Sequence, residues 1–336
     1  MSLFDDDIEQ DEFDAAEDSA SGAPPLAPEP RANADLISHD AIEKQLIGWW
    51  QSGTLPHTLI FAGPQGVGKA TLAYRLARFL LATPAPAVDD MFGAAPVPTS
   101  LNIPFSHPVF SKVASSGHPD LMSIGRVVNE KTGVLQSEIV VESARDVPNF
   151  LRRTASDGGW RVVVIDEAET LNRNAQNALL KILEEPPAKA MLILITQAAG
   201  ALIPTIRSRA RLVHIEPLPM ADFTTLMRKY RPDLSAADTE LLACISGNAP
   251  GRAMALLDQG GISTIRESLS LLDTVKTTPD AALWLLAEKL AVKSTPDPLQ
   301  GMLDITAWSL RDVARKAALA NVCPAFKWAL GTLDVF

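Results

Sequence analysis

Cysteines are scarce in this chain, and long apolar runs are absent from it. Among 336 residues only Cys244 and Cys323 are cysteines, too few for a disulfide framework and without metal-ligand spacing, so we expect both to be reduced. No uninterrupted apolar segment approaches the roughly 20 residues of a membrane-spanning helix, and the N-terminus shows no basic region followed by an apolar one. The sequence therefore predicts a cytoplasmic protein with no membrane span and no signal peptide.

Basic residues are missing from the first 30 positions, which hold ten acidic side chains. The formal net charge of −10 comes from this stretch, because the other 306 residues carry 30 acidic and 30 basic groups. A leader rich in Asp, Ala and Pro buries too little apolar surface to order itself, so we predict a disordered acidic tail over residues 1–33. A folded part without net positive charge is not expected to bind DNA strongly on its own, although a neutral total can conceal a basic face.

A short apolar run that ends in two carboxylates is the first strong pattern. Val162 to Ile165 is β-branched throughout, which predicts a central parallel strand covered on both faces. Asp166 and Glu167 follow at its carboxyl end, the edge where open α/β sheets place their ligands. One carboxylate there can hold a metal-bound water, and the other can orient an attacking water. Two acidic residues also end strands without any function, so the pair depends on a phosphate-binding loop upstream.

Such a loop is present as GPQGVGKAT, from Gly63 to Thr71, between an apolar run and a helical pattern. Strand, glycine loop and helix in this order form a site for nucleotide phosphates. Gly63, Gly66 and Gly68 let successive backbone N–H groups turn toward one anion. Lys69 adds a positive charge for the outer phosphates. Together these residues predict a site for ATP.

One position of the loop departs from the pattern. The residue after Lys69 should carry a hydroxyl that binds magnesium, and here it is Ala70. Thr71 has a hydroxyl, but it lies about 100° further round the helix. Either the nucleotide binds without well-held magnesium, or the loop is a structural remnant. The sequence favours impaired hydrolysis over active hydrolysis and leaves ATP and magnesium binding open.

Helical and strand patterns continue on both sides of this loop and acidic pair. Ser38 is expected to cap a helix that ends near Trp50, and a second helix is expected from Val141 onward. After the acidic pair, a helix should end abruptly at Pro186 and Pro187. Its apolar face should pack on the sheet and comprises Ala175, Ala178, Leu179, Ile182 and Leu183.

The next predicted strand and the loop after it add two polar candidates. Met191 to Ile195 is apolar and ends at Thr196, where a polar side chain can sense a phosphate. The segment from Pro204 to Arg209 then carries two arginines beside the predicted sheet. An exposed Arg is usually a solvated side chain, but one beside a nucleotide fold can reach the γ-phosphate of a neighbouring subunit.

Periodicity and composition divide the chain into parts. Residues 34–216 predict an α/β P-loop domain with a parallel sheet, residues 217–260 a small helical lid, and residues 261–336 an all-α C-terminal domain. Residues 83–108 hold six prolines and are expected to be an irregular insertion. His107 and His118 lie near its end, and we interpret them as surface histidines with hydrogen-bond partners, so no metal site is predicted.

Three ordered motifs carry a family resemblance. The string NALLKILEEPP from Asn177 to Pro187, the pair Ser208-Arg209, and GNAPGR ending at Arg252 resemble the AAA+ clamp-loader family of DNA replication. Within it the chain most resembles the delta-prime type of subunit of bacterial DNA polymerase III. The resemblance covers roughly residues 36–258 and extends loosely through the C-terminal helices. It implies an AAA+ domain, a helical lid and a C-terminal collar that mediates oligomerisation.

The resemblance also implies roles for single residues. Arg209 matches an arginine finger that reaches into the ATP site of an adjacent tau/gamma subunit. Arg252 matches a lid arginine that contacts nucleotide, Thr196 a polar sensor, and Asp166 with Glu167 the acidic pair. The implied partners are tau/gamma and delta subunits in a five-subunit ring, with the sliding clamp and primed DNA reached through the complex.

Two functions remain open at this point. The chain is a ring member that supplies Arg209 in trans, or it is an active tau/gamma-like ATPase that uses Lys69, Asp166 and Glu167 in cis with Thr71 at magnesium. Many relatives bind zinc through a cysteine cluster that should lie within residues 83–117, and no cysteine is there, so no zinc is expected. This absence and Ala70 favour the first function.

Overall fold

We describe the chain from a computed structural model, in which residues 27–83, 98–128, 135–155, 159–259, 261–274 and 298–319 are described, with residues 133, 279, 284 and 288 as single positions. Most of the predicted acidic tail and of the proline-rich insertion lies outside these residues, as does Cys323.

A five-stranded parallel sheet in the order β2-β3-β4-β1-β5 forms the centre of the first part. The strands are β1 (Thr58–Ala62), β2 (Leu121–Ile124), β3 (Arg161–Ile165), β4 (Ala190–Thr196) and β5 (Arg211–His214). Every residue of β1, β3 and β4 is buried, as their uninterrupted apolar runs predict. β2 and β5 form the edges and are partly exposed. The central strands therefore bring the glycine loop, the acidic pair and Thr196 to one end of the sheet.

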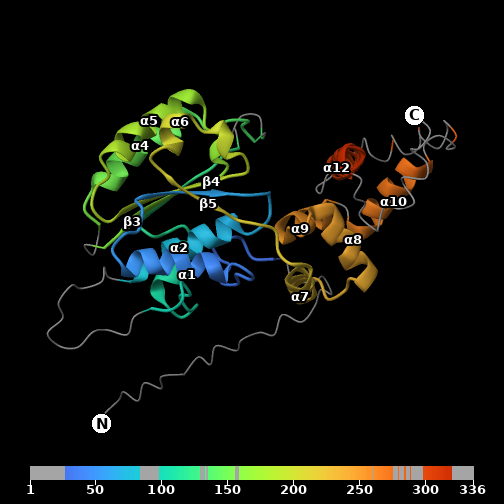
Figure 1. Cartoon of the computed structure of the whole chain (residues 1–336), viewed down its shortest axis with the longest axis horizontal. Coiled ribbons are helices and arrows are strands. Elements are labelled where there is room, and N and C mark those ends of the chain that lie inside the picture. The colour runs from blue at the N-terminus through green and yellow to red at the C-terminus, as the bar shows by residue number, and fades with distance from the viewer. Residues whose placement is uncertain are drawn as a thin grey trace, which may run out of the picture.

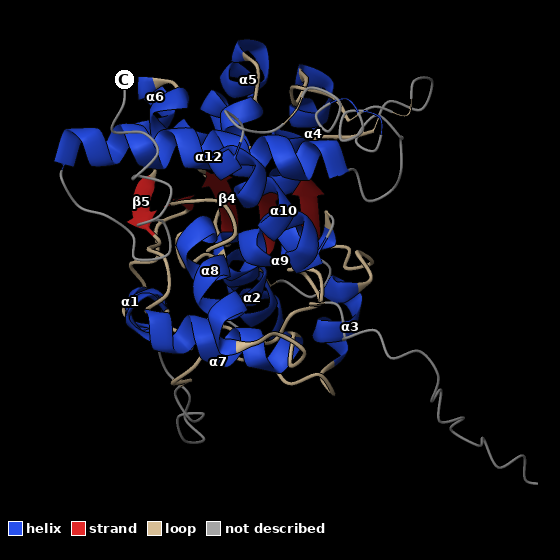
Figure 2. Cartoon of the chain, turned by 90° about the vertical axis from the view of Figure 1, so that its right-hand side faces the viewer, coloured by secondary structure: helices blue, strands red, loops and turns tan. Residues whose placement is uncertain are grey.

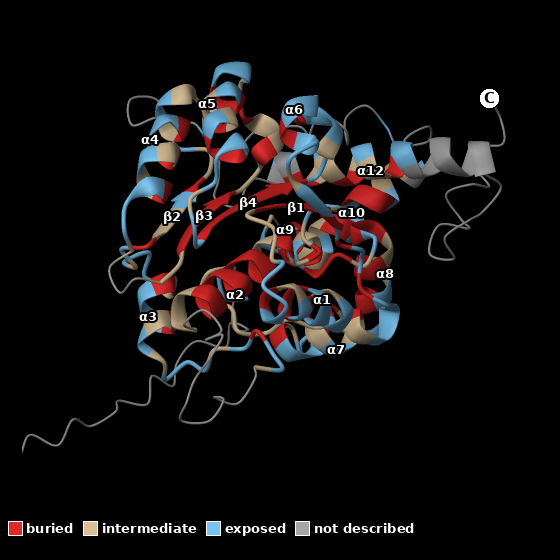
Figure 3. Ribbon diagram, turned by 60° about the vertical axis from the view of Figure 1, so that its left-hand side comes forward, coloured by how far each residue is buried: buried red, intermediate tan, exposed pale blue. Residues whose placement is uncertain are grey.

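Helices cover both faces of this sheet (Figure 1). On one side lie α1 (Asp40–Gln51), α2 (Lys69–Ala82) and α3 (Pro108–Ala114), and on the other α4 (Val141–Arg152), α5 (Arg173–Glu184) and α6 (Pro204–Arg207). Short 3-10 turns follow β3 (η1, Ala168–Thr170) and β4 (η2, Ala199–Ala201). The strands are buried between the two helical layers (Figure 3), and each face of the sheet has its own apolar cluster. The expected α/β sheet architecture is confirmed.

Two helix boundaries agree with the sequence and one does not. α4 begins at Val141, and α5 ends at Glu184 just before the two prolines. The expectation for Ser38 is wrong, because α1 has His39 at its N-cap and no side-chain cap. The Ser38 hydroxyl instead donates to the Asp222 carboxylate, far away in the chain. That tertiary contact replaces the local capping bond.

The C-terminal part is helical, with α7 (Met220–Tyr230), α8 (Ala236–Ser246), α9 (Pro250–Asp258), α10 (Gly261–Thr274) and α12 (Pro298–Leu319). Figure 2 shows α12 beside α10, and α10 also contacts α9. One apolar cluster joins α7, α8 and α9 to Ile265, Leu269 and Ile305 of the last two helices. The predicted lid therefore packs closely against the helices that follow it.

Two further findings concern the composition. No helix in the described ranges has both the length and the apolar character needed to cross a membrane. Cys244 takes part in a disulfide, so the expectation of reduced cysteines is wrong for this residue. Whether a cysteine is bonded depends on what the fold brings beside it, which its position in the sequence does not show.

Candidate functional site

The glycine loop is shaped by close backbone packing as well as by its turns. Gly66 and Gly68 have φ angles of 78° and 100°, in the left-handed region that favours glycine. A Cβ atom at Gly66 would overlap the backbone nitrogen of Arg252, and the N–H of Gly251 donates to the Gly66 carbonyl at 2.9 Å. The loop thus contacts the start of α9 directly, a role for Gly66 that the sequence did not suggest.

Lys69 directs its charge back into this loop. Its Nζ donates to the carbonyl oxygens of Gly63 at 2.8 Å and Pro64 at 2.6 Å. Burial lowers the pKa of Lys69, and the nearby Asp166 and Glu169 carboxylates oppose that shift. The ammonium therefore lies at the loop, between the acidic pair and the phosphate cradle.

The two carboxylates after β3 have different surroundings. Burial raises the pKa of Asp166, whose Oδ1 accepts the Glu167 N–H at 2.9 Å. Glu167 has a left-handed backbone and forms a bidentate ion pair with Arg126, with N–O distances of 2.5 and 2.7 Å. A carboxylate held in this way is not free to orient a water. Of the two carboxylates, Glu167 is held by an arginine and Asp166 is held by the backbone N–H of Glu167.

Arg126 is a site residue that sequence reasoning missed. β2 pairs with β3 in parallel, and Ile124 lies opposite Ile165. Continuing this register by two residues brings Arg126 beside Glu167. The signal was therefore present, but it required recognising β2 as a strand, and β2 is a short edge strand with weak apolar character.

Thr196 lies at the end of β4, opposite Ala62 in the strand register, and is 1% exposed. Its Oγ1 accepts a hydrogen bond from the Ala198 N–H at 3.0 Å. The neighbouring Gln197 N–H donates to Glu169 at 3.2 Å. The hydroxyl group of Thr196 is thus fixed beside the loop, in the place predicted for a sensor.

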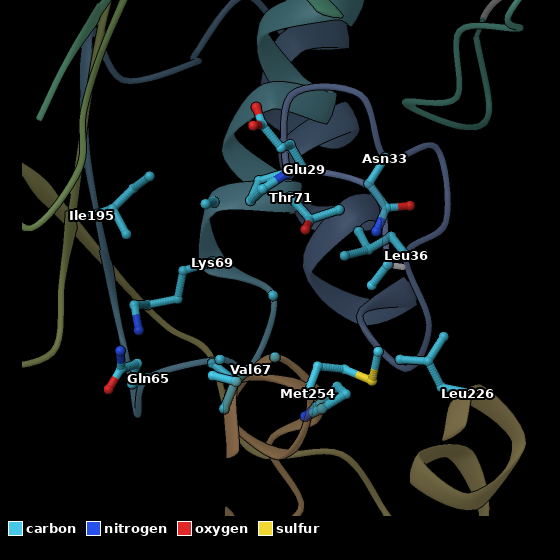
Figure 4. Close-up of a pocket in the computed structure, with 18 of the residues that line it drawn as sticks. Glu29, Asn33, Leu36, Gln65, Val67, Lys69, Thr71, Ile195, Leu226 and Met254 are labelled. Carbon is cyan, nitrogen blue, oxygen red and sulfur yellow. The ribbon is translucent and has the colours of Figure 1, made fainter. Parts of the chain in front are cut away.

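A cavity of about 470 Å³ brings these residues together (Figure 4). Lys69, Thr71 and Thr196 line it, together with residues of the lid and of the segment before α1. Its lining contains only one Lys or Arg, Lys69, among the described residues, against six carboxylates: Glu29, Asp35, Asp166, Glu167, Glu169 and Asp258. Three of the six are held in ion pairs, Glu29 with Arg31, Asp35 with Lys229 and Glu167 with Arg126, which reduces the excess of negative charge on this wall.

The segment before α1, residues 27–39, is tied to both walls of this cavity. Arg78 of α2 is 1% exposed and donates to the carbonyls of Arg31 and Asn33, both at 2.7 Å. On the lid side, the Asp35 carboxylate accepts from Lys229 at 2.6 Å and Tyr230 at 2.8 Å. The segment therefore connects α2 to α7 across the mouth of the cavity.

The residues present fit a nucleotide better than they fit magnesium. The left-handed glycines and Lys69 provide the cradle for phosphates. Ala70 offers no ligand, and Thr71, at the next position of α2, brings its hydroxyl to the cavity wall. The ligand set for magnesium is thus incomplete, and we derive no hydrolytic step from it.

Neither of the two arginines singled out in the sequence lines this cavity. Arg252 lines a second cavity with His214 and Arg311. Arg209 lines neither cavity; its side chain is 37% exposed and pairs with Glu184 at the end of α5, with an N–O distance of 3.1 Å. The Arg209 Nη1 also donates to the Thr205 carbonyl at 3.1 Å.

Comparison with known proteins identifies the relationship. Residues 38–219, more than half of the chain, match the family described as DNA polymerase III, delta subunit. The chain belongs to this family. The resemblance to AAA+ clamp loaders is thereby confirmed, and with it the AAA+ type of α/β fold.

Curated relatives of this family member include two delta-prime subunits of DNA polymerase III. The protein from Pseudomonas aeruginosa is 35% identical over 61% of this chain and 56% of its own length. The Escherichia coli protein is 31% identical over 67% and 61%, respectively. A tau subunit from Salmonella typhimurium is 26% identical over 75% of this chain and 34% of its own length. The chain thus spans about 56–61% of the length of the delta-prime relatives.

Proposed function

We propose that this chain is a delta-prime-type clamp-loader subunit of a replicative DNA polymerase III, which lends Arg209 to the ATP site of a neighbouring tau/gamma-type subunit. The observation that carries the proposal is the position of Arg209, which is exposed and lines neither cavity of its own chain. Because the guanidinium lies outside the nucleotide cavity of its own chain, we propose that its ligand is a nucleotide held by a second molecule. Its pairing with the exposed Glu184 is exchangeable, because surface ion pairs contribute little free energy.

The chain's own nucleotide cavity supports a role without hydrolysis. Ala70 supplies no hydroxyl for magnesium, Arg126 holds Glu167, and the cavity wall is rich in carboxylates. Each feature weakens one requirement of phosphoryl transfer: binding of the metal, orientation of the attacking water, and compensation of the negative charge of the phosphates. We infer that this cavity binds ATP weakly even in the presence of magnesium, and that the bound ATP is not hydrolysed.

The proposed partners follow from the family. As a ring component, the chain would stand beside tau/gamma and delta subunits and act with them on the sliding clamp and primed DNA. Outside the acidic first 30 residues the chain has no net positive charge, so contact with DNA is proposed only within the complex.

The experiment that tests the proposal is an Arg209→Ala substitution in a loader reconstituted with tau/gamma and delta subunits. We expect ATP turnover at the site that receives the finger to fall by about 10³-fold or more. The measured quantities are clamp- and DNA-stimulated ATPase and clamp loading. Arg207→Ala is the matched control, because Arg207 is exposed on the adjacent helix α6. Unchanged ATPase in the Arg209 variant would refute the finger assignment.

A second candidate function, an ATPase acting in cis, has one observation in its favour. Thr71 lines the cavity and carries the hydroxyl that Ala70 lacks. In this alternative, Lys69 would bind the phosphates, and Thr71 and Asp166 would hold magnesium or its bound water. The pairing of Glu167 with Arg126 does not favour it.

A further inference from the structure

A second cavity, of about 520 Å³, adjoins the nucleotide cavity. We call it the arginine cavity. Gln65, Gln197 and Ala255 line both cavities, so the two are neighbours at the outer end of the glycine loop. Three parts of the chain form its wall: the loop through Gly63 and Pro64, the lid helix α9, and the C-terminal helix α12.

The charges of the arginine cavity are opposite to those of its neighbour. Arg252 of α9 and Arg311 of α12 face one carboxylate, Asp304, and His214 also lies in the wall. Burial lowers the pKa of Arg252, the charge of Arg311 lowers it further, and Asp304 acts in the opposite direction. Two guanidinium groups that repel each other across a cavity form a favourable place for an anion.

Phosphate is the anion that this setting favours. A guanidinium group binds phosphate oxygens through paired N–H donors, and two of them can bind one group from both sides. The adjoining wall contains the first residues of the phosphate loop and the amide side chains of Gln65 and Gln197. Because Gln65 and Gln197 line both cavities, a nucleotide held at the glycine loop would border the cavity that contains the two arginines.

We propose that Arg252 and Arg311 form a phosphate site through which the C-terminal helix α12 contacts the terminal phosphate of a bound nucleotide. The new element is Arg311, since it joins a helix of the C-terminal part to the ligand of the sheet domain. The proposal rests on the proposed function only in taking a nucleotide as the source of the phosphate. Free phosphate or pyrophosphate has the same chemistry and is the other source.

Titration calorimetry on the full chain separates these sources, with ATP, ADP and pyrophosphate as ligands in the presence of EDTA. ATP is expected to bind about 10-fold more tightly than ADP, because charged hydrogen bonds to one more phosphate are formed. Arg311→Gln and Arg252→Gln should each remove this difference, and Arg311→Lys should restore part of it. Arg228→Gln is the control, since Arg228 is exposed on α7 and lines neither cavity. Thermal melts verify that each variant is folded.

Each outcome decides a different claim. If ATP and ADP do not bind but pyrophosphate does, and needs both arginines, the phosphate site stands and nucleotide binding by this chain fails. If ATP binds and Arg311→Gln changes no affinity, the phosphate site is refuted while nucleotide binding stands. Binding of none of the three ligands refutes the site. None of these results bears on Arg209, whose role the reconstituted loader tests separately.

Discussion

At the scale of single residues, position 70 determines whether the loop offers magnesium a hydroxyl ligand. Ala70→Thr would place a hydroxyl where phosphate loops of this type bind the metal. We expect magnesium to tighten ATP binding to this variant by about 10-fold, and to have a smaller effect on the unaltered chain. The measurement is an ATP titration with and without magnesium. Ala70→Val is the matched control, because it has the shape of Thr without the hydroxyl; an equal effect of both substitutions would contradict the account.

The ionised carboxylate of Asp166 lowers the stability of the folded chain at neutral pH, because it is buried. Burial raises its pKa above 3.8, so the folded chain binds this proton more tightly than the unfolded chain does. The contribution of Asp166 to the free energy of unfolding is therefore most favourable below pH 3.8. It is lost as the pH rises through the raised pKa of the folded chain.

Asp166→Asn should therefore increase the free energy of unfolding at pH 7, and the gain should shrink as the pH falls toward 3.8. Urea unfolding at several pH values measures this trend. Glu240→Gln on the exposed side of α8 is the control and should show no such gain. A destabilised Asp166→Asn at pH 7 would mean that the attraction to Lys69 exceeds the effect of burial.

At the scale of elements, the contact between the glycine loop and α9 sets the position of the lid. A Cβ at Gly66 would lie 2.8 Å from the carbonyl carbon of Gly251, in addition to its overlap with Arg252. Gly53 has a similar φ of 67°, but nothing lies within 4 Å of its Cβ direction. Gly66→Ala and Gly53→Ala therefore share the backbone strain and differ in the overlap.

We expect Gly53→Ala to lower the free energy of unfolding by about 1 kcal/mol, and Gly66→Ala by at least about 1 kcal/mol more. Chemical denaturation of both variants measures the difference. Equal losses would show that the loop does not press on α9. The comparison isolates the loop contact, because the two positions have nearly the same backbone strain.

The sequence predicted the elements whose burial is complete. β1, β3 and β4 are apolar except at one terminal residue each, and α5 has a regular apolar stripe with prolines after it, so local patterns were sufficient. β2 and α3 lay beside the proline-rich insertion, where edge exposure and short length weaken the periodicity. Missing β2 hid the neighbour of Glu167, because that contact depends on strand register.

The candidate site was predictable in its parts and less so in its arrangement. Loop glycines, Lys69, Asp166 and Thr196 meet at one cavity because parallel strands end at one edge of the sheet. Arg252 could not be placed from its motif, since its surroundings include Asp304 and Arg311 of α12, more than 50 residues later in the chain. Contacts between distant helices leave no local pattern in a sequence.

At the scale of the whole molecule, the chemistry of this family is divided between chains in our account. The sheet domain keeps the architecture of a nucleotide site, the segment 27–39 connects its helices to the lid, and the lid shares one core with the C-terminal helices. A subunit built in this way suits a role in which it presents Arg209 to a neighbour.

Magnesium-dependent ATP turnover by the purified full chain, alone and free of other loader subunits, tests the central claim most directly. Lys69→Ala is the reference, because it removes the ammonium at the loop. The account predicts that the unaltered chain releases phosphate no faster than this variant. Robust turnover that Lys69→Ala abolishes would contradict it and would establish the chain as an ATPase in its own right.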